Sequence, residues 1–95
     1  MNIRPVHPGE VLEEELDVLN VSPAELARQI GVPANRIGQI LHGRRAITGD
    51  TAVRLAHWFD MSAEFWMNLQ AQYDVTLARQ KLGDSLEQMP QRKSA

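Results

Sequence analysis

The chain has 95 residues, of which 43% are apolar, which suffices for one domain with a single modest core. A large catalytic cleft between domains is not expected at this length. The chain has no cysteine, which excludes disulfide frameworks, thiolate metal sites and cysteine nucleophiles. Its apolar runs fall far short of the roughly 20 residues that span a bilayer, and its N-terminus lacks a signal pattern. We therefore expect a cytoplasmic protein with no membrane partner.

The formal net charge is −2, but the charges are unevenly distributed along the chain. Residues 1–21 carry −4 and residues 46–74 carry −3, whereas residues 22–45 carry +3 and residues 75–95 carry +2. The segment 22–45 contains four arginines and a single acidic residue, Glu25. A polyanion responds to the local field, so this segment is the expected docking face for a nucleic acid.

Apolar residues recur at helical spacing and no stretch alternates as a strand would, which predicts an all-α fold of five helices. The first helix is expected from Pro8 to about Asn20, with proline in its first turn. Its predicted buried stripe is Val11, Leu12, Leu16 and Leu19. The second helix begins after Ser22, where the sequence SPAE forms a capping-box pattern.

Gly31 ends the second helix, because glycine readily takes the left-handed conformation that turns the chain. The third helix is expected from Pro33 or Ala34 to Leu41. Thr48 caps a fourth helix that runs to about Phe59, and its inward candidates are Val53, Leu55, Ala56 and Phe59. Ser62 caps a fifth helix that extends to about Leu82. Residues 1–82 are thus predicted to form one domain of five helices, and the polar residues 83–95 a flexible tail.

Residues 22–45 resemble a helix-turn-helix. Two short helices with a glycine turn occur in many proteins, so the pattern alone is not specific. Three details sharpen it: a small residue, Ala27, at the helix crossing, Gly31 at the turn, and Ile37 as an apolar contact back from the third helix. Together with the arginines that follow, they favour a major-groove reader over an exposed helix whose polar residues are merely solvated.

The N-terminal part of a recognition helix enters the major groove, which selects the candidates for base contact. Amides suit adenine edges, arginine suits guanine, and a methyl group packs on thymine. The expected base-contacting residues are Ala34, Asn35, Arg36 and Gln39. Gly38, on the same side, would permit close approach. The expected phosphate-contacting residues are Ser22, His42, Arg44, Arg45 and Thr48.

Other residue types carry weaker signals. The three histidines match no metal-ligand spacing, and no nucleophile has an identifiable base, so we expect no metal, no cofactor and no enzymatic activity. The aromatic residues follow helical spacing, which favours packing over a stacking platform for single strands. The row on the fifth helix is longer than a domain of this size needs, which suggests an interface with a second copy. The candidates are Trp58, Phe65, Trp66, Leu69 and Tyr73.

Three blocks in order resemble the HigA antitoxins, also called virulence-associated protein I, among the phage-repressor-like (XRE-type) helix-turn-helix proteins. These blocks are HPGEVL at 7–12, ITGDTAVRLA at 47–56 and FWMNLQAQYD at 65–74, and the resemblance covers about residues 3–82. It implies that residues 1–82 form a lambda-repressor-like DNA-binding and dimerisation domain. It implies in addition a homodimeric repressor that binds a palindromic operator in its own promoter. It also implies a protein partner, a HigB-like toxin that is a messenger-RNA endonuclease, which the antitoxin neutralises.

The resemblance leaves some points open. Pro23 stands where phage repressors often place a glutamine that contacts the phosphate backbone, so we expect no such contact here. No toxin-docking residues can be carried over. Two alternatives to an antitoxin remain open: a stand-alone regulator controlled by a small ligand, and a protein-interaction module that has lost DNA reading.

Overall fold

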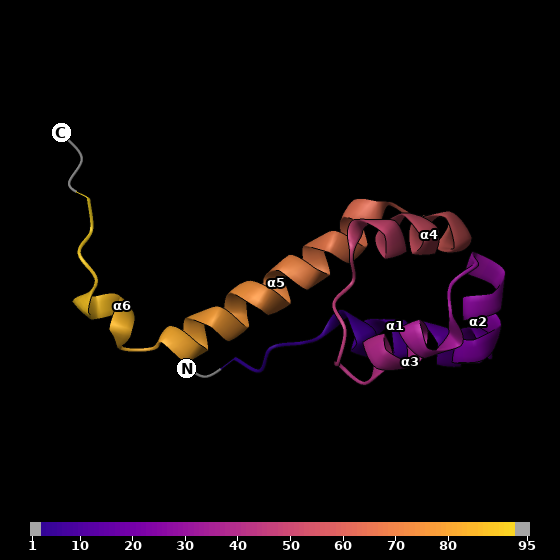
Figure 1. Cartoon of the computed structure of the whole chain (residues 1–95), viewed down its shortest axis with the longest axis horizontal. Coiled ribbons are helices and arrows are strands. Elements are labelled where there is room, and N and C mark those ends of the chain that lie inside the picture. The colour runs from indigo at the N-terminus through magenta and orange to yellow at the C-terminus, as the bar shows by residue number, and fades with distance from the viewer. Residues whose placement is uncertain (1–2, 93–95) are drawn as a thin grey trace.

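The computed structural model describes residues 3–92, and within that range it contains helices and no strand. In chain order these are α1 (Pro8–Leu19), α2 (Pro23–Ile30), α3 (Ala34–Leu41), α4 (Gly49–Phe59), α5 (Ala63–Leu82) and α6 (Ser85–Gln88). Figure 1 shows α1–α4 gathered at one end of the molecule, with α5 leaving them as a long rod. The all-α fold is confirmed, and the five predicted helices end within about a residue of their predicted bounds.

The helix starts follow from side-chain caps. Ser22, Thr48 and Ser62 each accept a hydrogen bond from a backbone N–H in the first turn of α2, α4 and α5. Such caps satisfy N–H groups that have no partner inside the helix. The capping box expected at Ser22 is only half formed, because the Glu25 carboxylate binds Arg28 and Gln29 instead. A complete capping box occurs at α1, where His7 and Glu10 form it.

The core is one cluster between α1, α2, α3, α4 and the first turns of α5. Its largest fully buried side chains include Trp66, Leu12, Leu26, Ile37, Ile40 and Leu55. Two expected core residues are wrong: Leu19 is 49% exposed at the end of α1, and Val53 is 60% exposed. Val53 lies opposite the buried face of α4, which is formed by Thr51, Ala52, Leu55 and Ala56. Helical periodicity alone does not show which face of α4 is buried.

The molecule is elongated. Its radius of gyration is 16.5 Å, against about 12 Å for a compact domain of this length. We call residues 71–88, the distal turns of α5 with α6, the arm; none of them is buried. Figure 1 shows the arm reaching away from the other helices, with the N-terminal segment running beside it. The tail predicted to be flexible contains a short helix, α6, and residues 93–95 of that tail, like residues 1–2 of the predicted domain, lie outside the described residues.

No helix within residues 3–92 is long and apolar enough to cross a membrane.

Candidate nucleic-acid interface

The crossing of α2 and α3 is built as the sequence predicts. Ala27 is 1% exposed and Ile37 is fully buried, so a small residue of α2 and an apolar residue of α3 meet in the core. Gly31 has φ of 75°, and its N–H bonds the Ala27 carbonyl to end α2. This packing fixes the angle of α3 to the rest of the molecule.

The C-terminal half of α3 rests directly on the start of α1. At Gly9, a Cβ atom would lie 1.9 Å from the backbone oxygen of Ile40, so only glycine lets the two backbones approach this closely. His7 caps α1 by accepting a hydrogen bond from the Gly9 N–H at 2.9 Å. The proposed recognition helix is therefore anchored at both ends of its inner face, by α2 and by α1.

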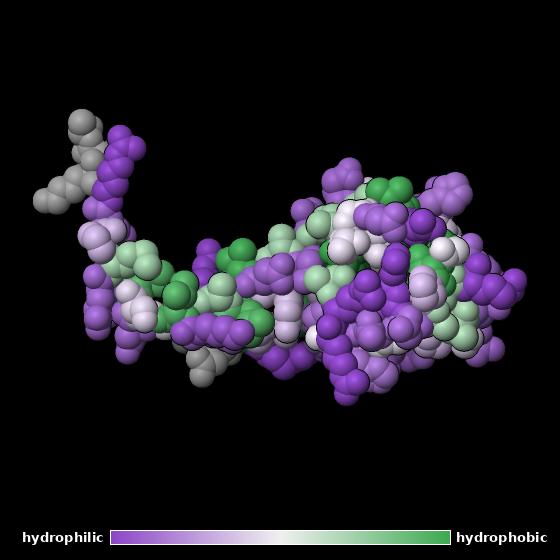
Figure 2. Space-filling view, viewed as in Figure 1, coloured by the Kyte–Doolittle hydropathy of each residue, from purple (hydrophilic) through white to green (hydrophobic). Residues whose placement is uncertain are grey.

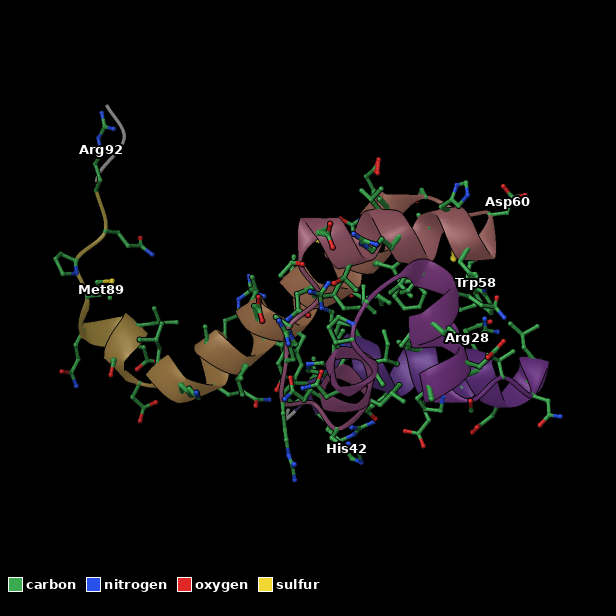
Figure 3. The ribbon with its side chains drawn as sticks, turned by 45° about the vertical axis from the view of Figure 1, so that its right-hand side comes forward. Arg28, His42, Trp58, Asp60, Met89 and Arg92 are labelled. Carbon is green, nitrogen blue, oxygen red and sulfur yellow. The ribbon has the colours of Figure 1, made fainter. Side chains whose placement is uncertain are left out.

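The opposite side of α3 carries the polar residues. We call the row Asn35, Gly38, Gln39 and His42 the outer ridge, since residues three and four apart share one side of a helix. Asn35, Gln39 and His42 are exposed. The His42 Nδ1 donates to the Gly38 carbonyl at 2.8 Å, and Figure 3 shows its ring at the solvent edge of the molecule. The ridge therefore presents two exposed amide side chains, with Gly38, which has no side chain, beside them.

Gly38 has no structural need to be glycine. A Cβ atom there would meet nothing within 4 Å, and its backbone is not in the left-handed region. Glycine inside a helix is about 1 kcal/mol less favourable than alanine. A residue that weakens its own helix and fills no crowded space suits a surface that another molecule approaches closely.

Basic residues follow the ridge. Arg44 and Arg45 are both exposed in the turn after α3, and the Arg45 Nη1 donates to the Gln39 Oε1 at 3.2 Å. The hydroxyl oxygens of Ser22 and Thr48 serve as helix caps, with Glu25 N–H at 3.1 Å and Thr51 N–H at 3.5 Å. The remaining expected base-contacting residue on this side, Ala34, is exposed in the first turn of α3.

Arg36 differs from the other candidates. Its side chain is only 25% exposed, and its Nη1 lies 3.3 Å from the Oδ2 of Asp50 on α4. Consecutive helix residues point about 100° apart, so Arg36 faces α4 while Asn35 faces outward. Arg36 was expected beside Asn35 and Gln39 as a base-contacting residue, but the structure places it beside the outer ridge and in an ion pair.

Comparison with known proteins assigns the fold to a family. Residues 12–66 match the helix-turn-helix family. The chain is 42% identical over 76 residues to virulence-associated protein I of Dichelobacter nodosus, covering 79% of this chain and 70% of that protein. An addiction module antidote protein of the HigA family from Coxiella burnetii has a TM-score of 0.92 at 46% identity, covering 96% of this chain and 100% of that one. The chain belongs to the HigA family.

A third relative of this HigA protein was solved with DNA. The Pseudomonas aeruginosa antitoxin HigA with the higBA promoter has a TM-score of 0.90 at 41% identity, and the match covers 96% of this chain and 100% of that chain. The fold of the present chain, including its helix-turn-helix, is therefore that of a HigA protein, and the outer ridge lies on α3 of this fold.

The motifs that carry the HigA resemblance prove to be structural in this chain. Gln70 is 5% exposed, accepts the Ile47 N–H at 2.7 Å and donates to Asp74 at 2.9 Å. His7 packs edge-on against Tyr73, with ring centroids 4.9 Å apart. Burial lowers the pKa of His7 more than the nearby Glu10 carboxylate raises it. These contacts tie α5 to the loop before α4 and to the start of α1, and sequence spacing contained no signal for them.

The residues expected at a dimer interface occupy different environments. Trp66 is 0% exposed, so it belongs to the core of the protomer and is removed from the expected interface. Trp58 donates to the Gln29 Oε1 at 2.6 Å and lies between α4 and α2 in Figure 3. Leu69 and Tyr73 are half-buried against their own chain, and Phe65 is 38% exposed. Helical periodicity identified the row but not which members the chain itself would cover.

Proposed function

We propose that this HigA protein binds an operator in its own promoter with the outer ridge of α3 and represses its own operon. The observation that carries this proposal is the ridge itself: exposed Asn35 and Gln39 flank Gly38, where a Cβ would meet nothing. Amide side chains can each make two hydrogen bonds to an adenine edge in the major groove. The similarity to a HigA solved with promoter DNA supports the same use of the fold.

The surrounding residues have separate proposed tasks. Asn35 and Gln39 contact base edges, and the Ala34 methyl group packs against a thymine. Arg44 and Arg45 neutralise phosphates without reading sequence, while His42 and the hydroxyls of Ser22 and Thr48 donate further phosphate hydrogen bonds. The start of α3 supports this arrangement, because Pro33 gives it no side-chain cap and leaves N–H groups for an anion.

We further propose that the protein acts as a homodimer, since a palindromic operator presents two half-sites about 34 Å apart. The arm offers the apolar surface for it. Four exposed residues of α5 follow the 4-3-4 spacing of a coiled-coil seam, namely Ala71, Val75, Ala78 and Leu82. Figure 2 shows hydrophobic side chains along this part of the molecule. Small alanines in such a row let a second helix approach closely.

The third part of the proposal is the partner. As an antitoxin of the HigA family, the chain binds and neutralises a HigB-like messenger-RNA endonuclease in the cytoplasm and has no catalytic activity of its own. Co-expression with a HigB-like toxin, taken from an open reading frame adjacent to its gene, tests this part. Co-purification and relief of growth inhibition are the expected results. Unrelieved inhibition with no complex would instead favour a stand-alone regulator.

The DNA-binding proposal is tested by mobility shift on the chain's own promoter at two salt concentrations. Gln39→Ala should change base preference at one position in each half-site, by about 1–3 kcal/mol. Arg44→Ala should weaken binding on all sequences and lower the salt slope by about 1 for each lost phosphate contact. Unchanged binding of both variants would show that the outer ridge is not the docking face.

A further inference from the structure

The carboxylate of Asp50, on α4, links the recognition helix α3 to α4 and, through Arg54, to the end of α2. Its Oδ2 lies 3.3 Å from the Nη1 of Arg36 on α3 and 2.9 Å from the Nε of Arg54 on α4. The Nη1 of Arg54 in turn donates to the Ile30 carbonyl at the end of α2, at 2.7 Å. Arg54 thus ties the Asp50 carboxylate to the end of α2, and the same carboxylate pairs with Arg36.

The pairing determines where the Arg36 guanidinium lies. The Arg36 side chain is 25% exposed and its Nε is buried without a hydrogen-bond partner, so its stem is packed rather than extended into solvent. Asn35, one residue earlier, is exposed on the outer ridge. Released from Asp50, a side chain as long as arginine at this position could reach the phosphates beside the groove that α3 enters.

Stability alone does not explain the pair. The Asp50 side chain is 58% exposed and the Arg36 side chain 25% exposed, so solvent screens the pair and its contribution to folding is modest. A phosphate contact, by contrast, adds affinity on every sequence and carries no base information. By pairing with the Arg36 guanidinium, the Asp50 carboxylate therefore removes one sequence-independent phosphate contact. The base contacts of Asn35 and Gln39 stay in place.

We propose that Asp50 is a specificity-determining residue, which holds Arg36 off the DNA backbone and so lowers binding to non-operator DNA. This inference rests on the proposed DNA-binding function. It makes Arg36 a positioned residue rather than a base reader, and it gives Arg54 the task of orienting the carboxylate.

The test measures binding of the whole chain to its own operator and to a scrambled duplex between 50 and 200 mM salt. Asp50→Asn keeps the shape of the side chain and removes its charge. On the scrambled duplex its salt slope should steepen by about 0.9 for each released guanidinium, so its affinity falls about threefold more than wild type across this range for each bound protomer. Its preference for operator over scrambled duplex should fall. If Asp50→Asn does not give the wild-type circular dichroism spectrum, Asp50→Ser is measured in its place.

Two variants separate release of Arg36 from a general loss of negative charge. Glu14→Gln removes the same charge from an exposed position of α1 and should leave the slope unchanged. The double variant Asp50→Asn with Arg36→Gln should return the slope to the wild-type value, because no guanidinium is then released. A slope that stays steep in the double variant would overturn the inference.

The possible outcomes distinguish failure of the inference about Asp50 from failure of the proposed DNA-binding function. A wild-type chain that prefers its operator, with an Asp50→Asn variant of unchanged slope and preference, would overturn the inference alone. A wild-type chain that binds neither duplex would overturn the inference together with the proposed function.

Discussion

The body of the molecule, residues 7–70, and its arm, residues 71–88, use apolar residues differently. The body exposes some, such as Val18 and Val53, but encloses enough of them to form a core: Leu12, Leu26, Ile37 and Trp66 are all 0% exposed. The arm exposes them: Val75 is 45%, Leu82 44% and Leu86 44% exposed. Figure 3 shows Met89 and Arg92, just past the arm, far from the helices of the body.

This difference shows which part of the chain buries its apolar surface within a single copy and which part does not. A body that buries its own apolar stripe should fold without a partner. An arm that leaves a regular apolar row in water loses the stabilisation that burial would give, of about 25 cal/mol for each Å². Association with a second copy would bury the apolar row of the arm, which accounts for its sequence. The body is the part that presents the outer ridge.

The largest effect should come from the centre of the body. Trp66→Ala removes the largest fully buried side chain and should lower the free energy of unfolding by about 3–5 kcal/mol. Urea denaturation followed by circular dichroism measures it. Phe65→Ala is the matched control, since its ring is 38% exposed, and should cost clearly less. Equal losses in the two variants would contradict the division into an enclosed core and an outer surface.

A pair of glycine substitutions compares the inner and outer sides of α3 within the body. Gly9→Ala places a Cβ 1.9 Å from the Ile40 oxygen and should destabilise by about 1–3 kcal/mol. Gly38→Ala meets nothing within 4 Å and should stabilise by up to about 1 kcal/mol, while weakening operator binding. Thermal melts and mobility shifts on both variants measure these changes. An alanine at 38 that leaves operator affinity intact would argue against close approach there.

Charge on the arm should affect association and leave folding nearly untouched. Val75→Asp should change the stability of the single chain by no more than about 0.5 kcal/mol, because the residue is exposed. Sedimentation at micromolar concentration should shift from dimer to monomer. Val18→Asp makes the same change on α1, at a residue that is 81% exposed, and should leave the dimer intact. A wild-type chain that sediments only as monomer would refute the seam.

The smallest effect concerns pH and the cap of α1. Burial lowers the pKa of His7 below its ordinary value of 6.5, so between the two values the unfolded chain binds more protons than the folded one. This contribution to stability is complete above pH 6.5 and is lost as the pH falls through the lowered value. Urea midpoints should therefore drop from pH 7.5 to pH 5.5, and less so in His7→Asn.

Carboxylates do not account for that change. Glu10 has a pKa lowered by Arg4, and Glu25 one lowered by Arg28, from a usual 4.5 in each case. Stability that depends on these two groups is lost below about pH 4.5, outside the range compared. A midpoint that falls equally in wild type and His7→Asn would assign the dependence to other groups.

Local chemistry made most of the fold predictable. Ser22, Thr48 and Ser62 begin helices because their hydroxyls accept first-turn N–H bonds, and Gly31 ends one because it accepts a positive φ. Such signals are contained in a few neighbouring residues, so they can be read without the tertiary structure. The outer ridge was predicted on the same basis, from spacing along one helix.

The misplaced residues depend on which elements meet. Trp66 was expected at an interface and Val53 in the core, because periodicity identifies a stripe but not the neighbour that covers it. The contacts of Gln70 with Ile47, and of Arg36 with Asp50, join residues 23 and 14 positions apart. A long-range contact of this kind has no local pattern, which is why Arg36 resembled a free base reader in the sequence.

The most direct test of the outer ridge follows backbone amide chemical shifts by NMR while an operator duplex is added to the whole chain. The largest changes are predicted at Asn35, Gly38 and Gln39, with smaller changes at Arg44 and Arg45 and little change along the exposed row of the arm. Largest changes on α4 or on the arm, with α3 unperturbed, would contradict the account.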